Sequence, residues 1–154
     1  MERTFVMIKP DGVQRRLAGR IIQRFEDKGL RIIGMKMIKM SHKQAEDLYS
    51  IHNGKPFYDT LVKFIVSSPV VVMAIEGNQA VLVARKLLGA TFGFNAEPGT
   101  IRGDFGGSKG LNLIHGSDSP ESSQREIPIF FSEGELVKYE HADIGWVYEE
   151  PERK

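Results

Sequence analysis

The stretch VVVMAI, residues Val70–Ile75, is the longest uninterrupted apolar run in the sequence, and it directly follows Pro69. Its β-branched residues favour a strand over a helix. Apolar side chains at every position are typical of a strand that is covered on both faces. We therefore expect this segment to lie in the middle of a sheet, since it is too short to cross a bilayer.

Three other segments have strand character, and they cover residues 3–9, 31–40 and 111–115. The first is also apolar on both faces, which predicts a second interior strand. In the second segment Ile33, Met35 and Met37 alternate onto one face. We interpret the methionines as core fillers, because a flexible thioether side chain suits irregular gaps in a core.

Apolar residues at helical spacing predict helices between these strands. The expected helices span residues 18–28, 41–49, 57–67 and 79–88. A later helix starts at Ser119 and is limited by Pro128, and capping boxes are expected at Ser41 and Ser132. The C-terminal segment with Trp146 is expected to dock on the body of the protein.

The order of these elements is strand, helix, strand, helices, strand, helix, strand. This order is typical of a split βαβ unit, an α+β ferredoxin-like sandwich with an antiparallel four-stranded sheet and helices on one face. An open doubly wound sheet is the alternative, and the chain length of 154 residues favours the smaller arrangement. We expect a single domain over residues 1–154, which is long enough to bury a substantial core.

The composition excludes several classes of function. The 21 Lys and Arg residues nearly balance the 20 Asp and Glu residues, so the formal net charge is +1 and gives no sign of nucleic-acid or membrane binding. There is no cysteine, which excludes disulfides, thiol nucleophiles and zinc held by cysteine. The N-terminal segment leads into a strand without the apolar core of a signal peptide, and we expect a cytoplasmic protein.

Chemistry is most strongly indicated around His115, where an apolar run ends in an imidazole followed by Gly116. A neutral imidazole is a competent nucleophile near pH 7 if one ring nitrogen is exposed and an acceptor holds the other. Glu126, two helical turns after Ser119, is the candidate acceptor. Ser117 could donate a hydrogen bond to a phosphoryl group in transfer.

Transfer of a phosphoryl group requires positive charge to stabilise the phosphate oxygens. This charge could come from Lys9, Arg85 and Arg102. The glycine-rich residues 99–110 form the end of a long segment, 91–109, that lacks periodicity and is expected to be a functional loop. Because glycine has no side chain, a phosphate could approach several backbone N–H groups of this segment. The chain has neither a Walker loop nor a dinucleotide fingerprint, and its DFG and RGD triplets are interpreted as chance matches.

Phe57 can be interpreted in two ways. It lies one residue off the main apolar stripe of its helix, where it would be free to stack on a ligand. It also belongs to a second stripe with Leu61 and Phe64, which would bury it. No cluster of residues has the spacing of a metal site, so no protein metal ligands are expected.

At this point the sequence resembles the nucleoside diphosphate kinase family. The stretch NLIHGSD at 112–118 is similar to the active-site signature of that family. The resemblance covers nearly the whole chain through further blocks: TFVMIKPDGV at 4–13, GKPF at 54–57, PGTIRGDF at 98–105 and Trp146.

The resemblance implies a ping-pong reaction. His115 takes the terminal phosphoryl group of a nucleoside triphosphate, becomes phosphohistidine and passes the group to a nucleoside diphosphate, while Mg²⁺ is carried by the phosphates. By the same analogy Phe57 stacks on the base and Tyr49 lies near the reacting group. The residues implied to bind the sugar and the phosphates are Lys9, Asn112, Arg85, Thr91 and Arg102.

Stacking on an aromatic face suits every base, so broad base specificity is expected. The family also implies a homo-oligomer, with a hexamer favoured and a tetramer possible. The chain departs from the family pattern at 92–95, where it has FGFN, and at Pro128, where a glycine is common. The alternative functions are a non-catalytic nucleotide-binding or scaffold module on the same fold and, less favoured, nucleic-acid binding.

One expectation conflicts with the motif itself. In a regular strand, side chains three positions apart lie on opposite faces of the sheet, so Asn112 and His115 would point in opposite directions. Both can serve one site only if the strand bulges or ends between them.

Overall fold

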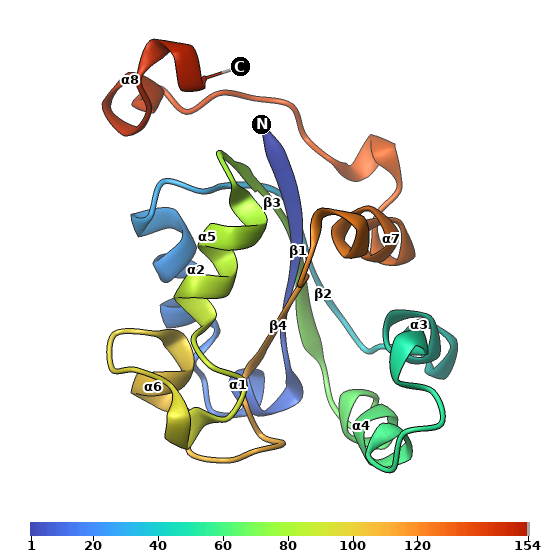
Figure 1. Ribbon diagram of the computed structural model, residues 1–154. Coiled ribbons are helices and arrows are strands. Elements are labelled where there is room, and N and C mark those ends of the chain that lie inside the picture. The colour runs from blue at the N-terminus through green and yellow to red at the C-terminus, as the bar shows by residue number, and fades with distance from the viewer. Residues whose placement is uncertain (154) are drawn as a thin grey trace.

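The computed structural model describes residues 1–153 and has a single four-stranded antiparallel sheet in the order β2-β3-β1-β4 (Figure 1). The strands are β1 (Glu2–Ile8), β2 (Arg31–Ile38), β3 (Val70–Gly77) and β4 (Ile114–Gly116). This is the expected α+β ferredoxin-like arrangement, so the prediction of the fold class is confirmed.

Helices surround the sheet. The α-helices are α1 (Pro10–Gln14), α2 (Ala18–Asp27), α3 (His42–Leu48), α4 (Tyr58–Ile65), α5 (Ala80–Leu88), α6 (Ile101–Phe105), α7 (Pro120–Phe130) and α8 (Ile144–Val147). Short 3₁₀ turns are η1 (Ser50–His52), η2 (Gly93–Asn95), η3 (Glu133–Glu135) and η4 (Glu150–Glu152).

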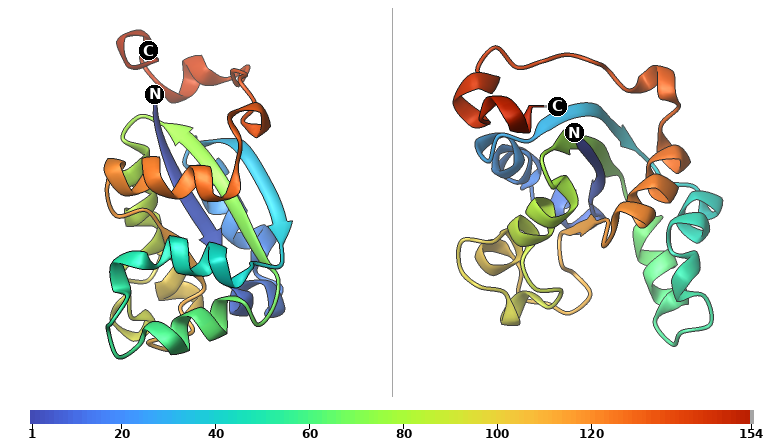
Figure 2. Two further views of the ribbon diagram at one scale, coloured as in Figure 1. Left: turned by 90° about the vertical axis from the view of Figure 1, so that its right-hand side faces the viewer. Right: turned by 45° about the horizontal axis from the view of Figure 1, so that its top comes forward.

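Both faces of the sheet are covered, which corrects the expectation of helices on one face. Helices α2, α5 and α6 lie on one side, and α3, α4 and α7 lie on the other (Figure 2). Alternate residues of β1 point into these two cores, with Phe5 and Met7 on the side of α7 and Val6 and Ile8 on the side of α5. Residues 5–8 of β1 are all apolar because both faces of the strand are covered.

Strand β3 is central, as its apolar run predicts. It pairs with β1 on one edge and with β2 on the other, and its residues Val70–Ile75 are buried. The edge strand β2 differs from the prediction. Its Met35 and Met37 are 53% and 63% exposed, so they are not core fillers.

A β-bulge between Ile32 and Gly34 explains that error. The bulge leaves Ile33 buried in the core on the α7 side, and Gly34 faces the same core, where an added Cβ would meet Phe131. The extra residue reverses the alternation beyond it and turns both methionines to the opposite face. A bulge of this kind depends on the partner strand and is not visible in local periodicity.

The predicted helix starts are confirmed where a local cap defines them. Ser41 and Gln44 form the reciprocal bonds of a capping box before α3, and the Ser119 side chain accepts from the backbone N–H of Ser122 at the start of α7. The predicted end of α7 is wrong, because the helix continues through Pro128 to Phe130. The proline lies in the last turn, where few hydrogen bonds of the helix remain to be disrupted.

The segment 91–109 has more regular structure than its lack of periodicity suggests. It contains η2 and the short helix α6, whose N-cap Thr100 accepts from the backbone N–H of Gly103. The Gly99 N–H is used inside the segment as well, because it donates to Asp104. These amides are therefore not free to bind phosphate in the way the glycine content suggests.

The C-terminal segment crosses one end of the sheet, near the start of β1 (Figure 1). It is held by a bond from the Val137 N–H to the Ile33 carbonyl, by Val147 against Gly29 and by the Tyr148 hydroxyl at Asn78. The predicted docking of the segment is therefore confirmed, although the Trp146 side chain is 94% exposed and takes no part in it. Among residues 1–153 no helix has the length and apolarity needed to span a membrane.

Candidate active site

His115 lies in the middle of the short strand β4, in an aromatic surrounding. Its ring meets the Tyr49 ring edge-on at a centroid distance of 5.6 Å and lies 5.8 Å from the Phe5 ring. The side chain is 17% exposed. The imidazole is therefore held firmly while part of it remains accessible from outside.

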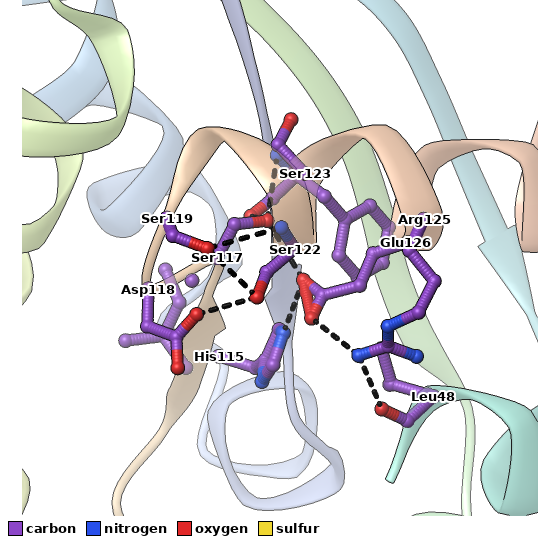
Figure 3. Close-up of polar contacts among 12 residues, drawn as sticks. Leu48, His115, Ser117, Asp118, Ser119, Ser122, Ser123, Arg125 and Glu126 are labelled. Carbon is purple, nitrogen blue, oxygen red and sulfur yellow. Dashed lines mark hydrogen bonds and ion pairs between the residues drawn. The ribbon is translucent and has the colours of Figure 1, made fainter. Parts of the chain in front are cut away.

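The Nε2 atom of His115 lies 3.0 Å from Oε1 of Glu126, on α7 (Figure 3). Glu126 is buried, which excludes the alternative of an ordinary exposed glutamate on the helix surface. A carboxylate can only accept, so Nε2 carries the proton and the lone pair of a neutral ring lies on Nδ1. Glu126 thus fixes the tautomer that makes Nδ1 a nucleophile.

Ser117 is also directed at Glu126. Its hydroxyl is buried and donates to Oε1 of Glu126 at 2.7 Å, and it accepts from the Phe5 N–H at 3.3 Å. A single O–H cannot serve both Glu126 and a phosphoryl oxygen. The position favours orientation of the carboxylate over the direct donation expected from the sequence.

Asn112 and His115 can serve one site because the regular strand conformation does not extend to Asn112. Strand β4 begins only at Ile114, and the preceding Leu113 has a positive φ of 74°, which is uncommon for a non-glycine residue. Asp11 stabilises this conformation by accepting from the Leu113 N–H at 3.0 Å. The conflict with regular alternation is resolved because the strand does not extend to Asn112, and the prediction of a strand over 111–115 is corrected accordingly.

Asn112 links three parts of the chain. Its Oδ1 accepts from Nζ of Lys9 at 2.7 Å, and its Nδ2 donates to the carbonyl of Thr91 at 3.0 Å. Lys9 directly follows β1 and is 7% exposed. Burial, and then the charge of Arg102, lower the pKa of Lys9 to about 8. At neutral pH this lysine is a charged donor; the carboxylate of Asp11 raises its pKa but forms no ion pair with it.

Arg102, on α6, is held by backbone carbonyls. It donates to Asn112 at 3.1 Å, to Gly89 at 3.2 Å and to Ile114 at 2.5 Å. Burial, and then the charge of Arg85, lower the pKa of Arg102 to about 10. The side chain therefore braces the loop before β4 and also contributes positive charge.

Lys9, Arg85 and Arg102 share one property. None of them forms an ion pair with a carboxylate within residues 1–153. Arg85 instead donates to the carbonyl of Gly116, next to His115, at 3.4 Å. Lys9 and Arg102 are buried, whereas Arg85 is exposed. Buried cations without an ion-pair partner are costly, and this group is therefore suited to an anion that arrives from solution.

A line of aromatic rings leads from His115 to the outside. Tyr49 is followed by His52 at 6.2 Å and by Phe57 at 5.2 Å from His52. Phe57 is 49% exposed, so the interpretation that buries it is wrong, and its stacking on a ligand stays a prediction. Burial, and then Glu126, raise the pKa of the Tyr49 hydroxyl, which has no hydrogen-bond partner among the described residues.

Sequence reasoning missed three residues that contact this group. No role was predicted for His52, which lies between Tyr49 and Phe57. Asp11 and Arg125 had no assigned role. Asp11 belongs to the block 4–13, but only the contacts of Asp11 with Leu113 and of Arg125 with Glu126 reveal what these side chains do.

A metal ion held by the protein alone would need several carboxylate or imidazole ligands. In the part of the chain that the structure describes, no three such side chains are grouped to hold one.

Comparisons with known proteins agree with this geometry. Residues 2–136 match the family model described as nucleoside diphosphate kinase. A nucleoside diphosphate kinase of Archaeoglobus fulgidus is 55% identical over 150 residues, covering 97% of this chain and 99% of that protein. One from Bacillus licheniformis is 57% identical over 148 residues, covering 96% of this chain and 100% of that protein.

Solved structures give the same result. The halophilic nucleoside diphosphate kinase of Halobacterium salinarum, solved in complex with CDP, superposes with a TM-score of 0.94 at 50% identity and covers 96% of this chain and 99% of that chain. A family protein from Babesia bovis superposes with a TM-score of 0.93 at 43% identity, over 96% of this chain and all of that one. The chain therefore belongs to the nucleoside diphosphate kinase family of enzymes.

Proposed function

We propose that the protein transfers the terminal phosphoryl group of a nucleoside triphosphate to a nucleoside diphosphate in two half-reactions, with His115 carrying the group in between. The observation that carries this proposal is the bond from Nε2 of His115 to the buried Glu126, which leaves the Nδ1 lone pair available. Membership of the family supports the overall exchange of phosphate between nucleotides.

In the first half-reaction the Nδ1 lone pair of His115 attacks the γ-phosphorus. The bond from this phosphorus to the β,γ-bridging oxygen breaks, and the nucleoside diphosphate leaves with the electron pair. The ring keeps its proton on Nε2 and becomes cationic, so the negative charge of Glu126 stabilises the product. The second half-reaction reverses these steps with a different diphosphate.

The nucleotide would lie along the group of unpaired cations. We assign Lys9 and Asn112 to the sugar hydroxyls, and Arg85, Thr91 and Arg102 to the phosphates, with Tyr49 beside the reacting group. Lys9 and Asn112 support this assignment because they already hold each other at 2.7 Å. Mg²⁺ carried by the phosphates would neutralise part of their charge.

Phe57 would stack on the base. It is half-exposed at the outer end of the ring series, and Lys55 lies over its face at 5.8 Å. Stacking uses the π-face that purines and pyrimidines share, and it requires no hydrogen bond to a base edge. We therefore propose broad base specificity.

We also propose a cytoplasmic homo-oligomer, with a hexamer favoured over a tetramer. Within residues 1–153 the outer edge of β2 pairs with no other strand, although its Ile33 carbonyl accepts from the Val137 N–H, and Met35 and Met37 are exposed on this strand. An exposed apolar edge strand is a typical surface for association. The mass in solution, measured by sedimentation, would decide between the two assemblies.

Initial-rate kinetics test the proposed reaction. With ATP and a second diphosphate varied together, a carrier mechanism predicts parallel lines in double-reciprocal plots, because the two nucleotides never occupy the site together. Intersecting lines would contradict the proposal. Nucleotide binding without any exchange would establish the alternative, a non-catalytic nucleotide-binding module.

A further inference from the structure

We propose that Arg125 is a positioning residue, which holds Glu126 and Tyr49 in place on the two sides of the His115 ring. The inference rests on the proposed function for its kinetic consequences, but not for its structural ones. Arg125 precedes Glu126 on α7 and points toward the end of α3, whereas Glu126 points toward His115 (Figure 3).

The first contact of Arg125 fixes the orientation of the Glu126 carboxylate. Its Nη2 lies 3.5 Å from Oε2 of Glu126, while Oε1 receives the bonds from His115 and Ser117. Each oxygen of the Glu126 carboxylate therefore has its own hydrogen-bond partners, which fix the orientation of the group. Without the guanidinium, the carboxylate could rotate about its terminal bond, because that torsion has a broad energy minimum.

The second contact reaches the helix that precedes Tyr49. Arg125 donates from Nη1 to the carbonyl of Asp47 at 2.8 Å and from Nη2 to the carbonyl of Leu48 at 3.4 Å. These carbonyls belong to the last turn of α3, where no intrahelical donors remain and a cation is favoured by the helix dipole. Tyr49 follows immediately as the C-cap residue.

One side chain therefore joins the two walls that enclose the imidazole. These are the edge-on ring of Tyr49, with its centroid 5.6 Å from that of His115, and the carboxylate of Glu126, 3.0 Å from Nε2. Helices α3 and α7 also pack against each other in the same hydrophobic core, and Arg125 adds polar contacts at the end of α3. We infer that loss of Arg125 changes the tautomer and the placement of His115 more than it changes nucleotide binding.

The test compares Arg125→Met with Arg125→Lys, which keeps the charge, and with Gln124→Met, a control at an exposed position of the same helix. Nitrogen chemical shifts of the imidazole report the tautomer of His115 in the protein without nucleotide. We expect Arg125→Met to lower the Nε2–H population, Arg125→Lys to restore most of it and Gln124→Met to leave it unchanged. An unchanged tautomer in Arg125→Met would overturn the proposal, whether or not His115 carries phosphate.

Kinetics supply the second measurement. Misplacement of a reacting group by about 1 Å can cost up to about a hundredfold in rate, and we expect Arg125→Met to lower kcat by about tenfold, with KM changed by less than about twofold. Arg125→Lys should recover most of the loss. Equal losses in both variants, with a matching drop in the unfolding temperature, would indicate a purely structural role and contradict the proposal.

Discussion

The two ends of strand β1 carry the same kind of charge in opposite surroundings. At its start, Arg3 reaches Glu76 on β3 at 3.2 Å, and Arg31 on β2 pairs with the same carboxylate. Directly after its end, Lys9 is buried beside Arg102 and forms no ion pair within residues 1–153, although the carboxylate of Asp11 raises its pKa. We refer to these as the paired end and the unpaired end.

The difference separates a structural cluster from a binding site. At the paired end, burial alone would raise the pKa of the Glu76 carboxyl, but hydrogen bonds from Arg31 and Arg3 lower it. The charges there are satisfied within the chain. At the unpaired end the chain bears the cost of buried positive charge, a cost that an arriving polyphosphate would relieve.

The largest effect is expected from Lys9→Met at the unpaired end. Loss of this donor should lower kcat/KM by about a hundredfold, the usual magnitude for removal of one preorganised charged donor. Stability should rise by about 1 kcal/mol, because an uncompensated buried charge is removed. Steady-state kinetics and urea unfolding measure the two quantities on the same sample. A variant that loses stability and keeps its kcat/KM would show that Lys9 is structural.

The paired end should behave in the opposite way. Glu76→Gln leaves two partly buried guanidinium groups without their counter-charge and should destabilise the protein by about 2 kcal/mol. For a chain of this length that corresponds to a fall of about 6 °C in Tm. Exchange activity measured well below the new Tm should match that of the parent protein. A large loss of activity at full folding would extend the active site to this end of the sheet.

A smaller effect is expected from pH. The pKa of Lys9 is about 8 in the folded chain and 10.5 when it is unperturbed, so the folded state binds fewer protons between these values. Stability should therefore rise as the pH increases through this window, while nucleotide affinity falls, by at most about tenfold per pH unit. Calorimetric titration with a nucleoside diphosphate from pH 7 to pH 9.5 measures the affinity. Lys9→Met should lack this dependence, and an identical fall in the variant would assign it to another group.

Those parts of the structure that depend on local signals could be predicted from the sequence. Local sequence determines three of these parts, because the residues involved are close together in the chain. They are the central strand Val70–Ile75, the capping box at Ser41 and the N-cap at Ser119. His115 and its acceptor Glu126 were found for the same reason, since α7 follows β4 after a short turn.

Features that depend on distant segments could not be predicted. Met35 and Met37 were assigned to the wrong face because the bulge in β2 is defined by its pairing with β3. The start of β4 also depends on a distant residue. The positive φ of Leu113 is stabilised by Asp11, over a hundred positions earlier in the sequence. Arg125 acts through carbonyls of α3, which no local pattern connects to α7.

The most direct test of the central claim is to incubate the protein with a γ-labelled nucleoside triphosphate and no acceptor. We predict an acid-labile, base-stable label on His115, with phosphorus bonded to Nδ1, because Glu126 holds the proton on Nε2. Addition of any nucleoside diphosphate should remove the label, and His115→Ala should acquire none. Absence of the label, its persistence in His115→Ala or its attachment at Nε2 would contradict the account.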